Sequence, residues 1–379
     1  MKVLILTGAF GNGHVSASEA LRQQIESGTE GGSDVEIIDI VQYLFPHFSR
    51  VIYGVFNLMA GRFSGVYNAF NKIDERSSGL PMKRLFIKKF KKIADPFSPD
   101  LLIATLPISA RYLGAYKEYE GNRIPCITCI TDIYPHREWL YRSTDAYLVG
   151  DERSKEAIVK KGVDPEKIFV GGIPVKKEFR SWGQLEQNIS RVAHTAGASG
   201  AGKSSAPKNV LVMGGGLGLI PGIDAILDSF GGEPDVSVTV LCGKNEKLRK
   251  KLSAEYPGVN AVGYVTSAAE YLKKADLIVT KAGGITTFEA ISAGTPMAIL
   301  PPFLEQEQEN ALFVQRNGFG RMLPRERSEW GRTLRGMIND DRSAAEMRAN
   351  MRRFTALTEE SGILTIIEKT KAKNLSKVS

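Results

Sequence analysis

The residues best suited to bind a ligand lie between positions 277 and 310, where two short apolar runs are each followed by a group of polar side chains. The first run, residues 277–279, leads into Lys281-Ala282-Gly283-Gly284 and then into a predicted helix. Glycines let a ligand approach the backbone closely, and the unpaired amides and positive dipole end of a helix favour a phosphate. This turn therefore predicts an anion site whose members are Lys281, Gly284, Thr286 and Thr287.

Polar residues that suit sugar hydroxyls lie on both sides of the second apolar run. Glu289 is in the first turn of the predicted helix, and its carboxylate can accept two hydrogen bonds from the vicinal hydroxyls of a ribose. After residues 297–300 come the side chains of Gln306, Glu307 and Asn310. The glycine turn alone fits an ordinary strand-to-helix connection equally well, but the whole set predicts a site for a nucleotide sugar.

The best candidate for acid–base chemistry is His14, which follows Gly11-Asn12-Gly13 at the start of a predicted helix. Open α/β sheets bind ligands at the ends of such strands. The positive end of the helix disfavours imidazolium, so the ring is expected to be neutral near pH 7 and able to accept a proton. We predict that His14 is a general base and that Gly11, Asn12 and Gly13 form an acceptor or phosphate loop; helix capping by His14 is the alternative.

A second candidate, Asp132, follows the apolar run at residues 126–130. In a parallel sheet it would lie on the same rim as His14, where it could orient either the imidazole or an acceptor hydroxyl. A polar turn residue at the end of a buried strand is the alternative. His136 is a weaker candidate of the same kind.

The glycine-rich segment Gly214-Gly215-Gly216-Leu217-Gly218 follows an apolar run and precedes a predicted helix. By itself it is a generic phosphate loop, which a dehydrogenase would also have. The acidic residue that a dehydrogenase carries near the end of the next strand is missing, because that strand ends in Val240-Leu241-Cys242-Gly243-Lys244. The sequence therefore disfavours NAD.

Four segments together resemble one known family: Gly8-Ala9-Phe10-Gly11-Asn12-Gly13-His14, residues 131–136, residues 213–218 and residues 281–310. The family contains monogalactosyldiacylglycerol synthases, processive diacylglycerol glucosyltransferases and, more distantly, the peptidoglycan glycosyltransferase MurG. The likeness extends over nearly the whole chain. It implies a UDP-sugar donor and direct attack of the acceptor on the anomeric carbon with inversion, for which the histidine matching His14 is the base.

The resemblance also assigns the remaining donor-site residues. It places the glycine loop near the donor diphosphate and Tyr264 and Val265 against the uracil, the loop members being Gly214, Gly215, Gly216 and Gly218. The chain departs from the family at Leu304-Glu305, where the diacylglycerol enzymes often carry Pro-Gly before Gln306-Glu307. The choice between glucose and galactose is therefore left open.

Alternating short apolar runs and helical patterns predict parallel sheets in both halves of the chain. With 379 residues, the chain exceeds the size of a single core. We predict an α/β fold with two doubly wound Rossmann-like domains, and the resemblance implies that they face across a cleft as in the GT-B type. The predicted parts are an N-terminal acceptor and membrane-docking domain (1–180), a linker (181–208), a C-terminal UDP-sugar-binding domain (209–355), and a C-terminal helix and tail (356–379).

The predicted linker contains a formal Walker A match, Gly197 to Ser204. A P-loop needs a strand before it and a helix after it. His194-Thr195-Ala196 is not strand-like and Pro207 follows almost at once, so an ATPase is disfavoured.

The net charge of +8 includes a basic cluster between positions 83 and 92, interleaved with apolar residues. Such an amphipathic helix attracts anionic phospholipid, and an aromatic segment at residues 45–70 precedes it. We predict a membrane-docking surface formed by Lys83, Arg84, Phe86, Lys88, Lys89, Phe90, Lys91 and Lys92. The alternatives are that the aromatic residues pack inside the domain while the lysines are solvated, and nucleic-acid binding, for which no module accompanies the lysines.

No metal, disulfide or membrane span is expected. The sequence has no Asp-x-Asp triplet to hold a diphosphate-bridging metal, so the charge of the leaving group would be neutralised by the helix end and Lys281. Cys126 and Cys129 match C-x-x-C, but residues three apart on a strand point to opposite faces. No apolar run approaches the roughly 20 residues of a membrane helix. Together with the basic surface, this predicts a cytoplasmic protein bound peripherally to the inner face of the cell membrane.

The leading hypothesis is thus metal-independent, inverting transfer of glucose or galactose from a UDP-sugar to a membrane lipid, most simply 1,2-diacylglycerol. Transfer of N-acetylglucosamine to an undecaprenyl-linked acceptor, as in MurG, and transfer to a soluble acceptor are the alternative enzyme functions. A peripheral membrane protein without activity is a further alternative. The presence of His14, Glu289 and Gln306 in one chain argues against it.

Overall fold

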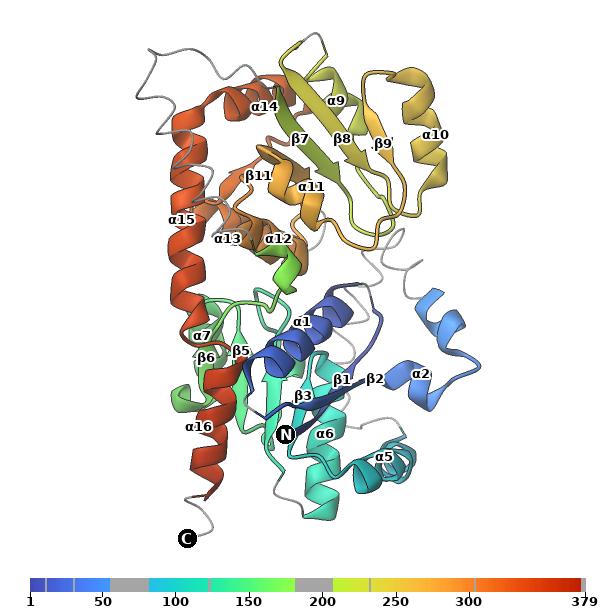
Figure 1. Cartoon of the computed structure of the whole chain (residues 1–379), viewed down its shortest axis with the longest axis vertical. Coiled ribbons are helices and arrows are strands. Elements are labelled where there is room, and N and C mark those ends of the chain that lie inside the picture. Colours follow the sequence, from blue (N-terminus) through green and yellow to red (C-terminus); the bar gives the residue numbers. More distant parts are fainter. Residues whose placement is uncertain are drawn as a thin grey trace. The chain divides into compact units, whose positions relative to one another are not determined.

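The computed structural model describes residues 1–10, 12–29, 31–54, 82–121, 124–180, 207–231, 233–302 and 305–375, and in it the chain divides into two compact units (Figure 1). Unit 1 comprises Met1–Lys177 and Ala356–Ser379, and unit 2 comprises Glu178–Thr355. Most of the predicted linker, residues 181–206, lies outside the described residues.

Unit 1 is built on a six-stranded sheet in the order β2-β1-β3-β4-β5-β6, in which every neighbouring pair is parallel. The strands are β1 (Lys2–Thr7), β2 (Asp34–Asp39), β3 (Leu101–Ala104), β4 (Cys126–Cys129), β5 (Ala146–Val149) and β6 (Ile168–Val170). The helices are α1 (Asn12–Gly28), α2 (Ile40–Leu44), α5 (Lys83–Phe97), α6 (Pro107–Glu120), α7 (Glu152–Val159) and α16 (Ile363–Leu375), with short 3-10 turns at Arg137–Trp139, Pro165–Lys167 and Lys177–Phe179.

Both faces of this sheet are covered, which explains why its strands are continuous apolar runs. Val3 and Ile5 join the cluster beneath α1 and α16, whereas Leu4 and Leu6 join the cluster beneath α5 and α6, since successive strand residues point to opposite faces. Cys126 and Cys129 belong to these two different clusters and are free thiols, in agreement with the expectation for C-x-x-C on a strand.

Unit 2 repeats the arrangement in the order β12-β11-β10-β7-β8-β9, again with parallel pairs. Its strands are β7 (Lys208–Met213), β8 (Val236–Leu241), β9 (Asn260–Val262), β10 (Leu277–Thr280), β11 (Met297–Ile299) and β12 (Gly320–Met322). Its helices are α9 (Ile223–Asp228), α10 (Glu246–Glu255), α11 (Ala269–Lys274), α12 (Gly284–Ala293), α13 (Glu305–Arg316), α14 (Trp330–Asn339) and α15 (Asp341–Glu359), with a 3-10 turn at Arg327–Glu329. The boundary between the two units falls within α15, after Thr355.

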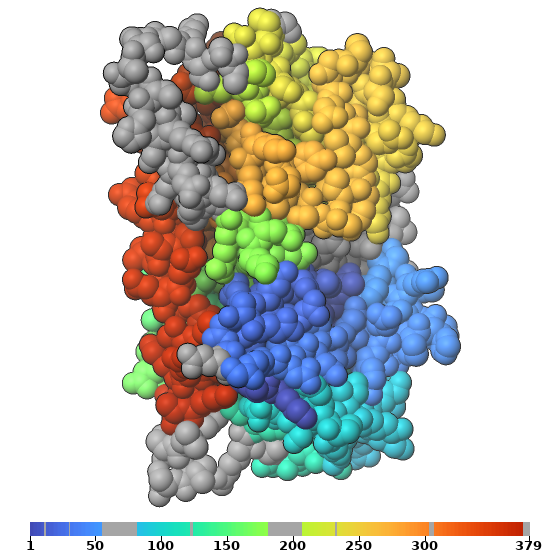
Figure 2. All heavy atoms as spheres, viewed as in Figure 1, coloured from blue at the N-terminus to red at the C-terminus, as the bar shows by residue number. Residues whose placement is uncertain are grey.

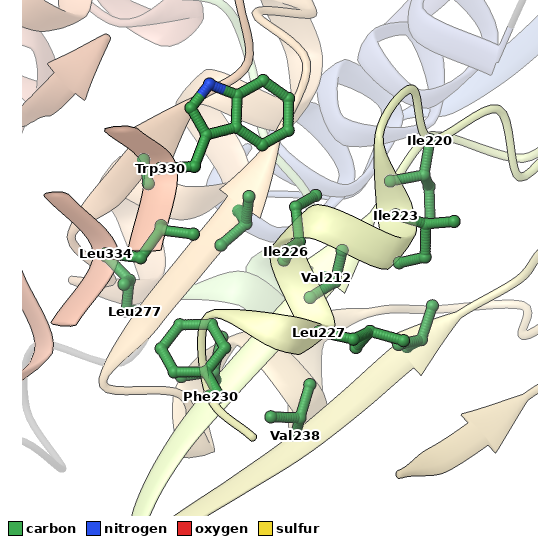
Figure 3. Close-up of a cluster of buried hydrophobic side chains, with 14 of the residues drawn as sticks. Val212, Ile220, Ile223, Ile226, Leu227, Phe230, Val238, Leu277, Trp330 and Leu334 are labelled. Carbon is green, nitrogen blue, oxygen red and sulfur yellow. The ribbon is translucent and has the colours of Figure 1, made fainter. Parts of the chain in front are cut away.

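The core of unit 2 joins helices that are distant in sequence. Figure 3 shows Trp330 and Leu334 of α14 beside Ile226 of α9 and Leu277 of β10. On α12, Phe288 stacks on Phe313 of α13, with ring centroids 5.7 Å apart. The predicted pair of doubly wound α/β sheets is confirmed.

The sheet order creates one topological switch point in each unit. In unit 1 the chain runs from β1 to β2 on one side and then returns to place β3 on the other side of β1. In unit 2 the same reversal occurs between β7 and β10. Open α/β sheets bind ligands outside the carboxyl ends of the strands at this point, so the loops after β1, β3, β7 and β10 are the places to look for a site.

Helix α5 corrects part of the predicted membrane surface. Phe86 and Phe90 are 1% and 0% exposed, stack on each other, and pack against Tyr112 and Tyr116 of α6. Residues four apart share one helix face, and here that face turns toward the sheet, so the prediction that these two phenylalanines contact lipid is wrong. For this pair the alternative of packing inside the domain holds.

Residues 55–70 of the predicted aromatic segment lie outside the described residues. None of the helices described is long and apolar enough to cross a membrane.

Candidate active site

The centre of the candidate site in unit 1 is His14, near the start of α1. Its Nδ1 atom lies 2.8 Å from the carbonyl oxygen of Thr105 and 2.8 Å from the hydroxyl oxygen of Thr131. A carbonyl oxygen only accepts hydrogen bonds, so Nδ1 carries the hydrogen. In the neutral ring Nε2 is therefore the atom that can accept a proton.

Residues from three parts of the chain hold the imidazole in place. Thr105 follows β3 and Thr131 follows β4, while Ser18 on α1 lies one turn after His14. The Ser18 hydroxyl donates to the His14 carbonyl oxygen at 2.8 Å, and its oxygen is also 2.8 Å from Thr105 Oγ1. The parallel order of the sheet brings these residues together at the switch point. Thr105 and Ser18 were missed by the sequence analysis, since neither belongs to a recognisable motif.

Asp132 follows Thr131 in the sequence, and its carboxylate contacts Trp139 and His136 rather than His14. Its Oδ2 accepts from the indole nitrogen of Trp139 at 2.7 Å and lies 3.5 Å from Nε2 of His136. Trp139 is fully buried in the 3-10 turn Arg137–Trp139. The structure thus brings Asp132 and His136 close to His14, while orientation of the imidazole comes from Thr105 and Thr131.

Electrostatics at this cluster favour the neutral form of His14 and the ionised form of Asp132. Burial is the largest influence on His14 and lowers its pKa, although the charge of Asp132 and the bond to Thr105 oppose the shift. Burial raises the pKa of Asp132, but hydrogen bonds from His136 and Trp139 and the charges of His136 and His14 outweigh it, so this pKa is lowered. At neutral pH the site accordingly holds a neutral imidazole beside a carboxylate.

The loop before His14 is only partly described. Gly11 and the side chain of Asn12 lie outside the described residues, and Gly13 belongs to the first turn of α1. Their prediction as an acceptor or phosphate loop therefore stays a prediction.

In unit 2 the glycine loop Gly214, Gly215, Gly216 and Gly218 connects β7 to α9 at the switch point. Gly215 and Gly218 have φ angles of 74° and 63°, and a β-carbon on Gly218 would lie 1.8 Å from the carbonyl oxygen of Cys242. The Lys244 amide donates to the Gly216 carbonyl oxygen at 3.0 Å. The loop thus packs directly on the connection after β8, and its glycines have a structural role whether or not they contact a diphosphate.

Tyr264, predicted beside the uracil, is half exposed after β9, and Val265 beside it is partly exposed. The Lys244 ammonium lies 5.6 Å from the centre of the Tyr264 ring. Lys244 was not predicted as a site residue; its position directly after the β8 strand was the available signal.

The turn after β10 has the features of an anion site. Helix α12 begins at Gly284 after Gly283, and no side chain caps its N-terminus. Thr286 is partly exposed there, whereas the buried Thr287 hydroxyl has no hydrogen-bond partner within the described part of the chain. Buried hydroxyls nearly always have one, so this group suits a polar ligand.

The acidic and amide residues of the predicted nucleotide-sugar site have different surroundings. Glu289 is 8% exposed on α12, and Lys281 Nζ lies 3.9 Å from Glu307 Oε1. Asn310 is buried, and its amide donates to the Ala282 carbonyl oxygen at 2.8 Å, so it holds the turn after β10. The Gln306 side chain lies outside the described residues. Among the described residues, no three His, Cys, Asp or Glu side chains gather in a way that could hold a metal ion.

Comparison with known proteins identifies both halves of the chain. Residues 14–175 match the family described as monogalactosyldiacylglycerol (MGDG) synthase, and residues 209–365 match the glycosyltransferase family 28 C-terminal domain. The protein is a glycosyltransferase built from two doubly wound α/β domains. The match to the monogalactosyldiacylglycerol synthase family and the relatives named processive diacylglycerol beta-glucosyltransferase confirm the family predicted from the sequence.

Two relatives are named processive diacylglycerol beta-glucosyltransferase. That of Bacillus cytotoxicus is 28% identical over 363 residues, which are 92% of this chain and 89% of the relative. That of Bacillus licheniformis is 28% identical over 378 residues, or 96% and 94% of the two chains.

Solved structures share the fold at lower identity. Acinetobacter baumannii MurG is 15% identical, with a TM-score of 0.57 over 95% of this chain and 99% of that chain. UDP-GlcNAc 2-epimerase from Neisseria meningitidis is also 15% identical, with a TM-score of 0.59 over 98% and 100%. Since one of these proteins is an epimerase, the fold alone does not specify the reaction.

The packing of the glycine loop predicts unequal effects of alanine at two positions. Gly215→Ala meets no atom within 4 Å and should cost only the left-handed backbone penalty of about 1 kcal/mol. Gly218→Ala adds a clash with the Cys242 carbonyl and should lower the free energy of unfolding by more than about 3 kcal/mol. Urea unfolding of the two variants measures the difference, and equal losses would show that the contact relaxes.

The surroundings of His14 predict the pH dependence of activity. Because the His14 pKa is lowered from the ordinary value of about 6.5, kcat/KM should be full at pH 7 and fall only at lower pH, as the base becomes protonated. Asp132→Asn removes a charge that raises this pKa, so the acid limb should move to still lower pH. Asp164→Asn, in an exposed turn, is the matched control and should leave the limb in place. Movement to higher pH in Asp132→Asn would contradict the assignment.

Proposed function

We propose that this protein transfers a hexose from a UDP-sugar to the free hydroxyl of 1,2-diacylglycerol with inversion at the anomeric carbon. The observation that carries the reaction is the His14 ring, whose Nδ1 is held by the Thr105 carbonyl and whose Nε2 is left as the base. The acceptor follows from relatives named diacylglycerol beta-glucosyltransferase, which also favour UDP-glucose as donor. A β product from the α-linked sugar of UDP-glucose requires inversion.

The reaction needs one proton transfer and one displacement. Nε2 of His14 takes the proton of the acceptor hydroxyl as its oxygen attacks the anomeric carbon. The bond between that carbon and the diphosphate oxygen breaks, and UDP leaves with the electron pair. The imidazolium formed is stabilised by the nearby charge of Asp132 and then returns its proton to solvent.

Unit 2 supplies the groups for the leaving diphosphate. The uncapped N-terminus of α12, the Thr287 hydroxyl and Lys281 provide donors and positive charge, which supports transfer without a metal ion. We assign Glu289 to the ribose, Tyr264 to the uracil and Glu307 to the sugar.

The test is transfer of radiolabel from UDP-glucose and UDP-galactose, in EDTA, into chloroform-extractable product on diacylglycerol vesicles. Wild-type protein should label lipid, and His14→Ala should lower kcat by about 10²- to 10⁴-fold. Lys247→Ala changes an exposed residue of α10 and should retain activity. Labelling that survives in His14→Ala would remove His14 as the base. Transfer only from UDP-N-acetylglucosamine, or only to a soluble acceptor, would overturn the proposed substrates.

We further propose that unit 1 contacts an anionic membrane surface through the exposed side of α5, at the inner face of the cell membrane. Lys83, Arg84, Lys88 and Lys92 are exposed, whereas Lys89 donates to the Leu44 carbonyl and Lys91 pairs with Glu120. Figure 2 shows α5 (cyan) next to residues 40–54 (blue), and the Lys89 ammonium donates to the Leu44 carbonyl oxygen of that segment. In that neighbouring segment the side chains of Phe48 and Val51 are 65% and 62% exposed. Apolar and basic side chains can therefore both contact a membrane surface.

The exposed cations predict a defined loss of vesicle binding. Arg84→Gln with Lys88→Gln removes two charges, each worth about 1 kcal/mol near an anionic surface, so affinity should fall about 30-fold. Lys247→Gln with Lys250→Gln removes two exposed charges from α10 and is the matched control. Co-sedimentation with phosphatidylglycerol vesicles measures both. Equal binding by the α5 variant and the wild type would contradict this surface.

A further inference from the structure

The loop that leads from β1 to His14 is tied to a segment about 40 residues further along the chain. The Ala9 amide donates to the Tyr53 hydroxyl oxygen at 3.0 Å and to Oδ2 of Asp39 at 3.2 Å. Phe10 follows directly, and its ring meets the Tyr53 ring edge to face, with centroids 5.0 Å apart. Two adjacent residues of the loop therefore contact the same tyrosine, through the backbone of one and the side chain of the other.

Asp39 is a rigid anchor for these contacts. It ends β2 directly beside Thr7, the last residue of β1. Its Oδ1 accepts from the amides of Val41 and Gln42 at 2.9 Å each, which caps α2, and from the Tyr53 hydroxyl at 2.5 Å. Both carboxylate oxygens of Asp39 therefore have hydrogen-bond partners, which fix the orientation of this side chain and the position of the Tyr53 hydroxyl.

The Tyr53 hydroxyl links the two sides of this network. It donates to Asp39 and accepts from Ala9, so both of its hydrogen-bonding functions are used. Burial, together with the hydrogen bond and charge of Asp39, raises the pKa of Tyr53, which keeps the hydroxyl protonated and donating at any working pH. Phenylalanine at this position would keep the ring contact with Phe10 and lose only the link.

We propose that Tyr53 is a positioning residue for the base: through Ala9 and Phe10 it sets the start of α1, and with it the place of His14 relative to the acceptor hydroxyl. The proposal rests on the proposed function, because it assigns His14 the proton transfer. The donor groups belong to unit 2, so loss of this link should act on the chemical step and leave UDP-sugar binding unchanged. Small displacements of a catalytic group have large effects on rate.

Tyr53→Phe tests the proposal against a matched variant. Tyr43→Phe makes the same chemical change in the neighbouring helix α2, where the hydroxyl donates to the Lys89 carbonyl oxygen at 2.8 Å and does not reach the loop. In Tyr53→Phe, kcat for hexose transfer to diacylglycerol should fall about tenfold with KM for the UDP-sugar unchanged. Tyr43→Phe should keep the wild-type kcat.

Amide hydrogen exchange gives a readout that needs no substrate. Exchange of the peptide covering residues 8–14 should be faster in Tyr53→Phe than in the wild type, because the Ala9 amide loses a partner, and it should be unchanged in Tyr43→Phe. Faster exchange with lower kcat supports the proposal. Unchanged exchange in residues 8–14, or an equal loss of kcat in both variants, overturns it.

The two readouts also separate this proposal from the proposed function. If wild-type protein labels no lipid from either UDP-hexose, the proposed function fails, while exchange in residues 8–14 still decides whether Tyr53 holds the loop. If wild-type protein is active and Tyr53→Phe loses protection without losing kcat, the link exists but does not position the base, and the proposal is overturned.

Discussion

The arrangement of this protein depends on the reversal of strand order in a parallel sheet. Between β1 and β3, and again between β7 and β10, successive connections leave on opposite sides, and the loops at the carboxyl ends of the strands converge. In unit 1 this places Thr105 against His14, more than 90 residues away in sequence. In unit 2 it places the glycine loop and the start of α12 at one edge. Each site is thus assembled by the sheet rather than by a single motif.

Two opposing electrostatic effects act on His14. Burial disfavours imidazolium and lowers the pKa of the ring, while the Asp132 carboxylate favours the charged form. Asp132 acts through its charge, because its hydrogen bonds are directed to Trp139 and His136. The orientation of the His14 ring and the charge near it therefore come from different residues.

Several residues that suggest ligand binding also have structural roles. Gly218 allows the loop after β7 to approach the backbone at Cys242, and Asn310 holds the turn after β10. On α5, the basic residues are divided between solvent and contacts within the unit, and the aromatic residues face the core. A ligand site and the packing that supports it therefore share residues, and a substitution can alter both.

Much could be predicted from the sequence, because strand and helix patterns are local. Apolar runs and glycine turns were sufficient to predict two doubly wound sheets, and the resemblance of four motif segments was sufficient to predict the family. The buried face of α5 could not be predicted, because that face packs against α6. The partners of His14 and Ala9 could not be predicted either, because Thr105, Asp39 and Tyr53 belong to no motif and meet these residues only when distant strands pair. The sequence by itself determined the elements and the chemical types at their ends; only the tertiary structure decided which side chains meet, because those contacts depend on strand order and helix packing.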